Sequence, residues 1–294
     1  MDKTIRPRRS VLYVPGGNAR MQEKARGVAA DSVVIDLEDS VAPEAKPEAR
    51  ALTAATVRAG GFGAREVAIR INPPGSAWFD EDLSAAAGAA PDAILITKVQ
   101  TSEDILGAEA RLDGLGTPEK VALWAMIETP RGILDARAIA DLAATGKSRR
   151  LAGFVLGTND IAKETRARPG RDRAPLAPVL VMAVLAARAA NLFVLDGVYN
   201  DFSDAAGFEA ECVQGRDFGM DGKTLIHPSQ IDIANRVFSP SAEEIAEARA
   251  IIDAFARPEN AGKGAIRLDG RMVELLHADI AARTLAIAAS IEGR

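Results

Sequence analysis

The chain has 294 residues, of which 48% are hydrophobic, which is enough for one large domain with a dry core and a modest appendage. The formal net charge is −5, and the basic residues are scattered apart from short clusters such as Arg6, Arg8 and Arg9, so the charge pattern argues against nucleic acid as a partner. The only cysteine is Cys212, which excludes an intramolecular disulfide and favours a reducing, cytoplasmic setting.

The N-terminal segment, residues 1–10, is charged and lacks the apolar centre of a secretion signal. No run of about 18 apolar residues occurs anywhere in the sequence, and the apolar stretch 180–190 is too short to cross a bilayer. We therefore expect a protein that is neither exported by that route nor embedded in a membrane.

Short apolar runs rich in Val, Ile and Leu alternate with longer stretches of helical character, a pattern typical of repeated β-α units. The runs lack polar alternation, which favours parallel strands buried on both faces. Eight such runs predict an α/β fold, a closed (β/α)8 TIM barrel. The runs span residues 11–14, 32–36, 66–71, 93–98, 121–127, 153–156, 192–198 and 223–226.

Several helix starts can be read from capping residues. Thr101 or Ser102 is suited to cap one helix, Pro130 to occupy the first turn of another, and Ser239 or Ser241 to begin a later one. After residue 238 the β-α rhythm stops, and residues 242–255 and 272–291 are predicted to form two helices joined by 258–264. The sequence thus predicts a catalytic barrel over 1–238 and a C-terminal helical segment over 239–294 that acts as a lid or an oligomer contact.

Polar residues follow most of the apolar runs. Catalytic groups of such barrels lie at the carboxyl ends of the strands, so these residues are expected to meet at one mouth. In chain order they are Asp36, Glu38, Asp39, Arg70, Asn72, Lys98, Glu128, Thr129, Asn159, Asp160, Asn200, Asp201 and His227.

Glu128 and Asp160 are the candidate metal ligands, because each is delivered to the mouth directly by an apolar run. Two carboxylates can share Mg²⁺, which prefers oxygen ligands and keeps water or substrate oxygens in its other positions. With only two histidines in the chain, an imidazole-rich zinc site cannot be assembled in one subunit. The alternative for Asp160, as for Asp39 and Asp201, is a helix-capping role.

Two cations are expected at the same mouth. The planar guanidinium of Arg70 suits a substrate carboxylate or a developing oxyanion, and an ion pair with Glu38 or Asp39 is compatible with that task. Lys98 is expected to form a salt bridge rather than a Schiff base, which would require a lowered pKa. For His227, which precedes Pro228, the alternative to a role in the site is to orient a backbone carbonyl.

Several of these segments together resemble the HpcH/HpaI aldolase/citrate lyase family, in particular the citrate lyase β-subunit and the malyl-CoA and citramalyl-CoA lyases. The likeness spans nearly the whole chain. The segments that carry it are Val11-Leu-Tyr-Val-Pro-Gly16, Val34-Ile-Asp-Leu-Glu-Asp-Ser-Val41, Arg70-Ile-Asn72, Ile127-Glu-Thr-Pro130, Gly157-Thr-Asn-Asp160 and Gly222-Lys-Thr-Leu-Ile-His-Pro228.

The resemblance implies that Glu128 and Asp160 bind magnesium and that Arg70 contacts substrate. It also implies a CoA thioester over the barrel mouth, with Tyr13, Lys24, Ile226 and His227 among its neighbours, and a homo-oligomer, often a trimer. Glu38 and Asp39, which follow the second apolar run, complete the carboxylates expected to take part in catalysis. The other residue assignments of this paragraph follow from the family likeness.

One departure from the family pattern lies in the C-terminal segment. Where similar proteins carry an aspartate that reaches a neighbouring subunit's site and supplies acid–base chemistry, this chain has Glu274. The carboxylate is kept with one extra methylene, and a displacement of about 1 Å can cost roughly 100-fold in rate. Glu274 remains the candidate acid.

The expected activity is magnesium-dependent cleavage or condensation of a carbon–carbon bond in a 3-hydroxyacyl-CoA such as malyl-CoA or citramalyl-CoA, giving an acyl-CoA and a 2-oxoacid. Glu274 would protonate the enolate that cleavage leaves behind. The alternatives are hydrolysis of the malyl-CoA thioester, a subunit that binds a carrier-linked thioester, and an aldolase that does not need CoA.

Overall fold

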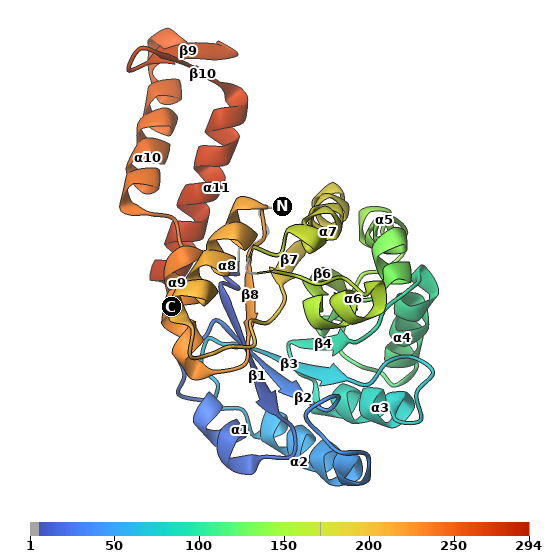
Figure 1. Cartoon of the computed structure of the whole chain (residues 1–294). Helices are drawn as coiled ribbons and strands as arrows, with labels where there is room; N and C mark the ends of the chain where they lie inside the picture. Colours follow the sequence, from blue (N-terminus) through green and yellow to red (C-terminus); the bar gives the residue numbers. More distant parts are fainter. Residues whose placement is uncertain (1–5, 171, 294) are drawn as a thin grey trace. The chain divides into compact units, whose positions relative to one another are not determined.

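The computed structural model of the chain describes residues 6–170 and 172–293. Eight parallel strands pair in chain order, and β8 pairs back with β1, so the sheet closes into a barrel ringed by helices (Figure 1). The predicted (β/α)8 barrel is thereby confirmed. The strands are β1 (Ser10–Pro15), β2 (Ser32–Asp36), β3 (Glu66–Ile71), β4 (Ala93–Ile96), β5 (Ala122–Ile127), β6 (Leu151–Leu156), β7 (Phe193–Asp196) and β8 (Gly222–Leu225).

The helices begin where the capping residues predict. Thr101 caps α4 in a reciprocal capping box with Asp104, and Thr129 caps α5, whose first residue is Pro130. None of the helices in the described part of the chain is long and apolar enough to cross a membrane. The helices up to residue 237 are α1 (Ala19–Ala25), α2 (Lys46–Ala59), α3 (Phe79–Ala89), α4 (Ser102–Gly114), α5 (Pro130–Ala144), α6 (Thr158–Thr165), α7 (Ala177–Ala189), α8 (Ala205–Asp217) and α9 (Ile231–Val237), with short 3-10 turns at Pro43–Ala45, Ala174–Leu176 and Pro228–Gln230.

One buried cluster of the core takes alternate residues from several strands. It contains Val11, Val34, Ala68, Ala93, Leu95, Trp124, Met126, Val155 and Leu195. Successive side chains of a strand point to opposite faces, so the residue two positions further on lies in the same row. Those next positions are Tyr13 on β1, Asp36 on β2, Arg70 on β3 and Glu128 just after β5. The same alternation that builds the core therefore places a polar layer above it.

The chain divides into two compact units, with residues 8–235 in the first and residues from Arg236 onward in the second. The second unit contains α10 (Ala242–Ala256), a 3-10 turn (Pro258–Asn260), β9 (Ala265–Leu268), β10 (Arg271–Glu274) and α11 (Leu275–Glu292). Ser241 caps α10 through a capping box with Glu244. The predicted pair of C-terminal helices is present, joined by a hairpin in addition to a loop.

The predicted start of the last helix at residue 272 was wrong. Residues 271–274 instead pair antiparallel with 265–268, and the helix begins at Leu275. The cause is the two-residue turn Asp269-Gly270, in which both residues have positive φ, 45° and 81°. An Asp-Gly pair with this geometry is a strong hairpin signal, because it matches the twist of the flanking strands.

A network of buried charges connects β7 and β8 to the surrounding helices. Asp196, with no exposed surface, accepts hydrogen bonds from Arg173 Nη1 at 2.8 Å and from Lys223 Nζ at 2.9 Å. Lys223 also donates to Glu211 Oε1 at 2.7 Å. Burial alone would raise the pKa of Asp196, but Lys223 and Arg173 hold it below its usual value. The opposite charges in this buried cluster therefore balance one another, and loss of any one of them leaves a buried charge without its counter-charge.

Replacing Asp196 with Asn leaves two buried cations short of a counter-charge, and we expect the free energy of unfolding at pH 7 to fall by about 3–5 kcal/mol. Since the folded pKa of Asp196 is depressed, its contribution is present above the unfolded pKa of about 4 and is lost as the pH falls through the folded value. The difference between wild type and Asp196→Asn in urea unfolding should therefore narrow below pH 4. An equal difference at every pH would contradict this account, and Asp217→Asn, on an exposed surface pair, serves as the control.

Candidate active site

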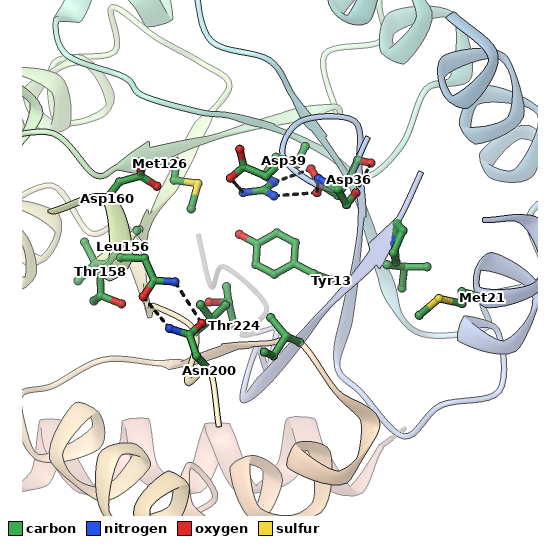
Figure 2. Close-up of a pocket in the computed structure, with 18 residues that line it drawn as sticks. Tyr13, Met21, Asp36, Asp39, Met126, Leu156, Thr158, Asp160, Asn200 and Thr224 are labelled. Atoms are coloured by element: carbon green, nitrogen blue, oxygen red, sulfur yellow. Dashed lines mark hydrogen bonds and ion pairs between the residues drawn. The ribbon is translucent and has the colours of Figure 1, made fainter. Parts of the chain in front are cut away.

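A cavity of about 380 Å³ opens among the polar residues at the carboxyl ends of the strands, a size that fits a small-molecule ligand. Figure 2 shows the Tyr13 ring pointing into its centre, with Asp36 and Asp39 on one side and Asp160 and Asn200 on the other. The predicted site residues that line it are Tyr13, Asp39, Arg70, Asp160 and Ile226.

Arg70 and Asp36 form the central ion pair of the cavity. Arg70 Nε lies 2.6 Å from Asp36 Oδ1 and Nη2 lies 2.7 Å from Oδ2, so the two planar groups pair in a bidentate manner. The third nitrogen, Nη1, lies 3.0 Å from Glu38 Oε2 and 3.8 Å from Asp39 Oδ2. The expected ion pairs with Glu38 and Asp39 are therefore present, but the forked face of Arg70 is occupied by Asp36, a partner that the sequence did not single out.

Tyr13 packs under this pair. The guanidinium carbon of Arg70 lies 4.7 Å from the centre of the Tyr13 ring, which is a cation–π contact. The Tyr13 hydroxyl is buried, and no hydrogen-bond partner is present for it in the described part of the chain. Burial raises the pKa of this phenol despite the nearby Arg70. The hydroxyl therefore remains protonated, with a hydrogen available to a ligand in the cavity.

The acidic turn after β2 is held by a buried lysine. Asp36 accepts hydrogen bonds from the backbone N–H of Glu38 at 2.8 Å and of Ser40 at 3.0 Å. Lys46 Nζ donates to the carbonyls of Leu37 and Glu38, both at 2.9 Å, and its side chain is almost fully buried. The turn is thus fixed from both sides. Lys46 was missed from the sequence because a lysine at a helix start has no motif that distinguishes it from a solvated one.

Lys98 connects the acidic turn after β2 to Glu128, which follows β5. Its Nζ lies 2.6 Å from Glu38 Oε1, which confirms the predicted salt bridge, and its backbone N–H donates to Glu128 Oε1 at 2.8 Å. Burial acts to lower the pKa of Lys98, but the bond to Glu38 raises it overall. A raised pKa keeps the ammonium charged, as a salt-bridge role requires and as a Schiff base does not.

Glu128 is only 1% exposed, although it is an acid. Burial raises its pKa to about 8, and the charges of Glu38 and Asp160 add to the effect. The carboxylate lies against Gly157, where an added Cβ would overlap Glu128 Oε2. Because Gly157 precedes α6, the missing side chain at this position lets β5 and β6 deliver Glu128 and Asp160 to the same place.

Asp160 occupies the first turn of α6 and is half-buried. The alternative of a helix-start role is consistent with that place, since a carboxylate there complements the helix dipole. Beside it, Asn159 and Asn200 exchange amide hydrogen bonds of 3.2 and 2.9 Å. This amide pair joins the first turn of α6 to the loop after β7 at the cavity edge.

Two predicted residues of the barrel unit do not line the cavity, and a third belongs to the other unit. Lys24 is exposed in the last turn of α1, and His227 is exposed at the start of the turn after β8. Glu274 belongs to the C-terminal unit, where it precedes α11 and its backbone N–H donates to His277 Nδ1 at 3.0 Å. Within the barrel unit the structure thus brings together Tyr13, Arg70, Glu128 and Asp160, and leaves Lys24 and His227 outside this group.

The donor set at the cavity suits a hard cation. The described residues that line it include several carboxylates and no histidine or cysteine. Within the described residues, three or more such side chains are nowhere grouped closely enough to hold a metal by themselves. Magnesium accepts a site in which two carboxylates bind it and water or ligand oxygens fill its other coordination positions. Zinc does not favour such a site.

Comparison with known proteins defines the class. The model of the HpcH/HpaI aldolase/citrate lyase family matches residues 9–228, and the chain belongs to this family. The resemblance found in the sequence is thereby confirmed.

Particular relatives add detail. The chain is 47% identical to a (3S)-malyl-CoA thioesterase of Cereibacter sphaeroides, over 97% of this chain and 96% of the relative. It is 33% identical to the citrate lyase subunit beta of Escherichia coli, over 92% and 90%. Among solved structures, CitE of Mycobacterium tuberculosis in complex with magnesium, acetoacetate and coenzyme A matches with a TM-score of 0.77 at 28% identity, over 96% and 98% of the two chains.

Replacing Gly157 with Ala tests the fit between Glu128 and the start of α6. The backbone there, with φ −97°, accepts alanine, so any loss arises from the overlap with Glu128. We expect a loss of about 1–3 kcal/mol in the free energy of unfolding, the usual cost of overpacking. Gly107→Ala, in α4 with open space around it, should instead stabilise by about 0.5–1 kcal/mol. Urea unfolding of both variants measures this, and equal behaviour of the two would contradict it.

Proposed function

We propose that the chain hydrolyses the thioester bond of a hydroxyacyl-CoA that carries a second carboxylate, such as malyl-CoA, in a magnesium-dependent reaction. The observation that carries the proposal is the 47% identity to a (3S)-malyl-CoA thioesterase over nearly the whole of both chains. The cavity supports it, because its wall contains a buried arginine and several carboxylates in a space of suitable size, with Lys98 paired to Glu38 beside it.

Glu128 and Asp160 are the proposed magnesium ligands. Burial and the negative charges of Glu38 and Asp160 raise the pKa of Glu128, and a bound cation would offset both effects. Magnesium also accompanies small oxoacids in structures of CitE, a relative with the same fold. When bound, the ion supplies positive charge to substrate oxygens at the reacting centre.

The chain's own residues supply fixed charge and proton transfer. Arg70 is held rigid by Asp36, and its remaining Nη1 edge, which pairs with Glu38, is the part that a substrate oxygen would share. Lys98 adds a second positive charge nearby. Burial raises the pKa of Glu38 even beside Arg70 and Lys98, which suits a group that takes and returns a proton. In hydrolysis a water oxygen bonds to the thioester carbon, the carbon–sulfur bond breaks, and CoA leaves as the thiol, with Glu38 and Asp39 as the proposed proton carriers.

Carbon–carbon cleavage is the second candidate, favoured by the family match and by the citrate lyase relatives. In this reaction the substrate hydroxyl loses its proton and the adjacent carbon–carbon bond breaks. The products are a 2-oxoacid and the enolate of a shorter acyl-CoA, which Glu274 would protonate. The same charged residues of the cavity serve both reactions, so only the identity of the products distinguishes hydrolysis from carbon–carbon cleavage.

A product assay by mass spectrometry separates these functions. Purified protein is given malyl-CoA, methylmalyl-CoA and citramalyl-CoA, with magnesium and with a chelator. Free CoA with intact malate supports hydrolysis, whereas a 2-oxoacid with a shorter acyl-CoA supports cleavage and overturns the primary proposal. No product from any of the three would favour a subunit that uses a carrier-bound thioester.

Glu128→Gln keeps the size of the side chain but weakens its ability to hold magnesium. We expect turnover to fall by at least about 100-fold with the fold intact, because the positive charge at the reacting centre is lost. Steady-state rates with and without chelator, together with circular dichroism, measure this. Glu164→Gln, on the exposed side of α6, is the control. Undiminished, chelator-sensitive turnover of Glu128→Gln would contradict the assignment.

We further propose that a second copy of the chain completes the site with Glu274, in a homo-oligomer. Large apolar side chains are exposed on β10 and α11, at a density that favours an interface. They are Met272, Leu275, Leu276 and Ile280. Three of these lie within two residues of Glu274, so a copy that covers them would also approach this carboxylate.

Glu274→Gln should lower turnover by about 10²–10⁴-fold, the usual contribution of an acid–base group, while the amide preserves the shape of the helix start. Co-expressed Glu128→Gln and Glu274→Gln chains should regain activity that neither has alone, because a mixed oligomer contains sites with both carboxylates. Rates of the mixed and separate preparations measure this, with Glu259→Gln as the surface control. Inactive mixed oligomers would contradict the shared site.

A further inference from the structure

The hydroxyl of Tyr13 is buried in the cavity wall without a partner among the residues that the structure describes. Figure 2 shows its ring pointing into the centre of the cavity. Ser40 lines the same cavity, but its hydroxyl donates to the carbonyl of Asp36 at 3.2 Å. The hydroxyl of Thr224 likewise donates to the carbonyl of Asp196 at 2.9 Å. Because an unpaired buried hydroxyl destabilises the fold, the Tyr13 hydroxyl indicates a hydrogen bond that forms only with a ligand.

The ring of Tyr13 is fixed by contacts that do not involve its hydroxyl. Tyr13 lies on β1, in register with Val34 of β2, and the ring packs against the buried cluster of the barrel core. The guanidinium of Arg70 contacts the ring as well, at 4.7 Å. A phenylalanine would make both contacts equally well. The hydroxyl is therefore not needed to hold the ring, and the ring holds the hydroxyl in place before any ligand arrives.

The surroundings of Tyr13 make its hydroxyl a neutral hydrogen-bond donor. Burial raises its pKa, and nearby carboxylates, among them Asp36 and Glu128, add to the effect. A phenol that keeps its proton donates to a ligand oxygen without carrying charge itself. The cations Arg70 and Lys98 instead suit an oxygen that is already charged, such as a substrate carboxylate. A neutral donor matches an oxygen that is uncharged in the substrate and gains charge during the reaction.

The carbonyl oxygen of a thioester is such an atom. In hydrolysis, a water oxygen bonds to the carbonyl carbon, and the electron pair of the C=O π bond moves to the carbonyl oxygen. The pair returns when the carbon–sulfur bond breaks, and CoA takes up a proton that the attacking water gave up. In carbon–carbon cleavage, the electron pair of the breaking bond forms an enolate, whose negative charge lies on the same oxygen. Both candidate reactions therefore develop charge at one substrate oxygen.

We propose that the Tyr13 hydroxyl donates a hydrogen bond to the thioester carbonyl oxygen and stabilises the negative charge that develops there. This inference rests on the proposed function, because it names the substrate atom that the hydroxyl meets. It also gives a reason for the unpaired hydroxyl, which destabilises the ligand-free protein but speeds the reaction. A hydroxyl that served only the fold would have the opposite effect on stability.

Tyr13→Phe removes only the hydroxyl and tests this role. With malyl-CoA and magnesium, we expect kcat to fall by about 100-fold, the usual effect of losing one donor to a developing oxyanion, with little change in KM. CoA lacks the acyl carbonyl, so its affinity, measured by isothermal titration calorimetry, should not change. The midpoint of urea unfolding of the ligand-free protein should rise, because a buried hydroxyl without a partner has been removed.

Tyr199→Phe is the matched control, since Tyr199 is the other tyrosine of the chain. Its hydroxyl donates to Asp204 at 2.9 Å, so this variant loses a hydrogen bond that is made within the protein. We expect its urea midpoint to fall slightly and its kcat to match that of the wild type. The two variants thus make the same chemical change and should shift stability in opposite directions.

The other outcomes separate this proposal from the proposed function. An unchanged kcat in Tyr13→Phe, or weaker binding of CoA, would overturn the assignment to the carbonyl oxygen. Lost activity with a lower urea midpoint would make the hydroxyl structural and overturn it as well. Release of a 2-oxoacid by the wild type would overturn hydrolysis, whereas a slower Tyr13→Phe in that reaction would still support the assignment. A wild type that acts on no CoA thioester would overturn both.

Discussion

The bidentate pair of Arg70 and Asp36 is the interaction on which the rest of the site depends. The two residues stand opposite each other in the register of β2 and β3, so the barrel itself brings them together. Both are nearly buried, and each would be costly there without the other. The pair supports the Tyr13 ring from above and leaves one edge of the guanidinium for Glu38, so removing either partner would disturb every group in that half of the cavity.

A surplus of carboxylates is the second constraint. Asp36 and Glu38 are compensated by Arg70 and Lys98. Within the described part of the chain Glu128 accepts a single hydrogen bond, from the backbone N–H of Lys98, and burial together with the nearby carboxylates raises its pKa. The barrel could have avoided this cost with an amide at position 128. Retaining a buried carboxylate there makes chemical sense when a cation is part of the working state, which is why the electrostatics and the family likeness support the same ligand pair.

The sequence was sufficient for the barrel and for the residues that reach its mouth, because buried parallel strands have continuous apolar runs and end in their functional groups. The sequence did not reveal which side chains pair with one another in the folded chain. The match of Asp36 with Arg70 depends on strand register, which no local pattern reveals, and the buried Lys46 resembles any lysine at a helix start. The hairpin before α11 was different, since Asp269-Gly270 is a local turn signal that the helical character of the surrounding residues obscured.

The two ends of the mouth differ in how they are organised. On the β2 and β3 side, position is set by ion pairs, which suit a charged and reacting group. On the β7 and β8 side, Gln230 and the Asn159–Asn200 amides set position with neutral hydrogen bonds. The mouth therefore has one side that is fixed by ion pairs and one side that is fixed by neutral hydrogen bonds, so a change of charge on the first side need not alter the geometry of the second.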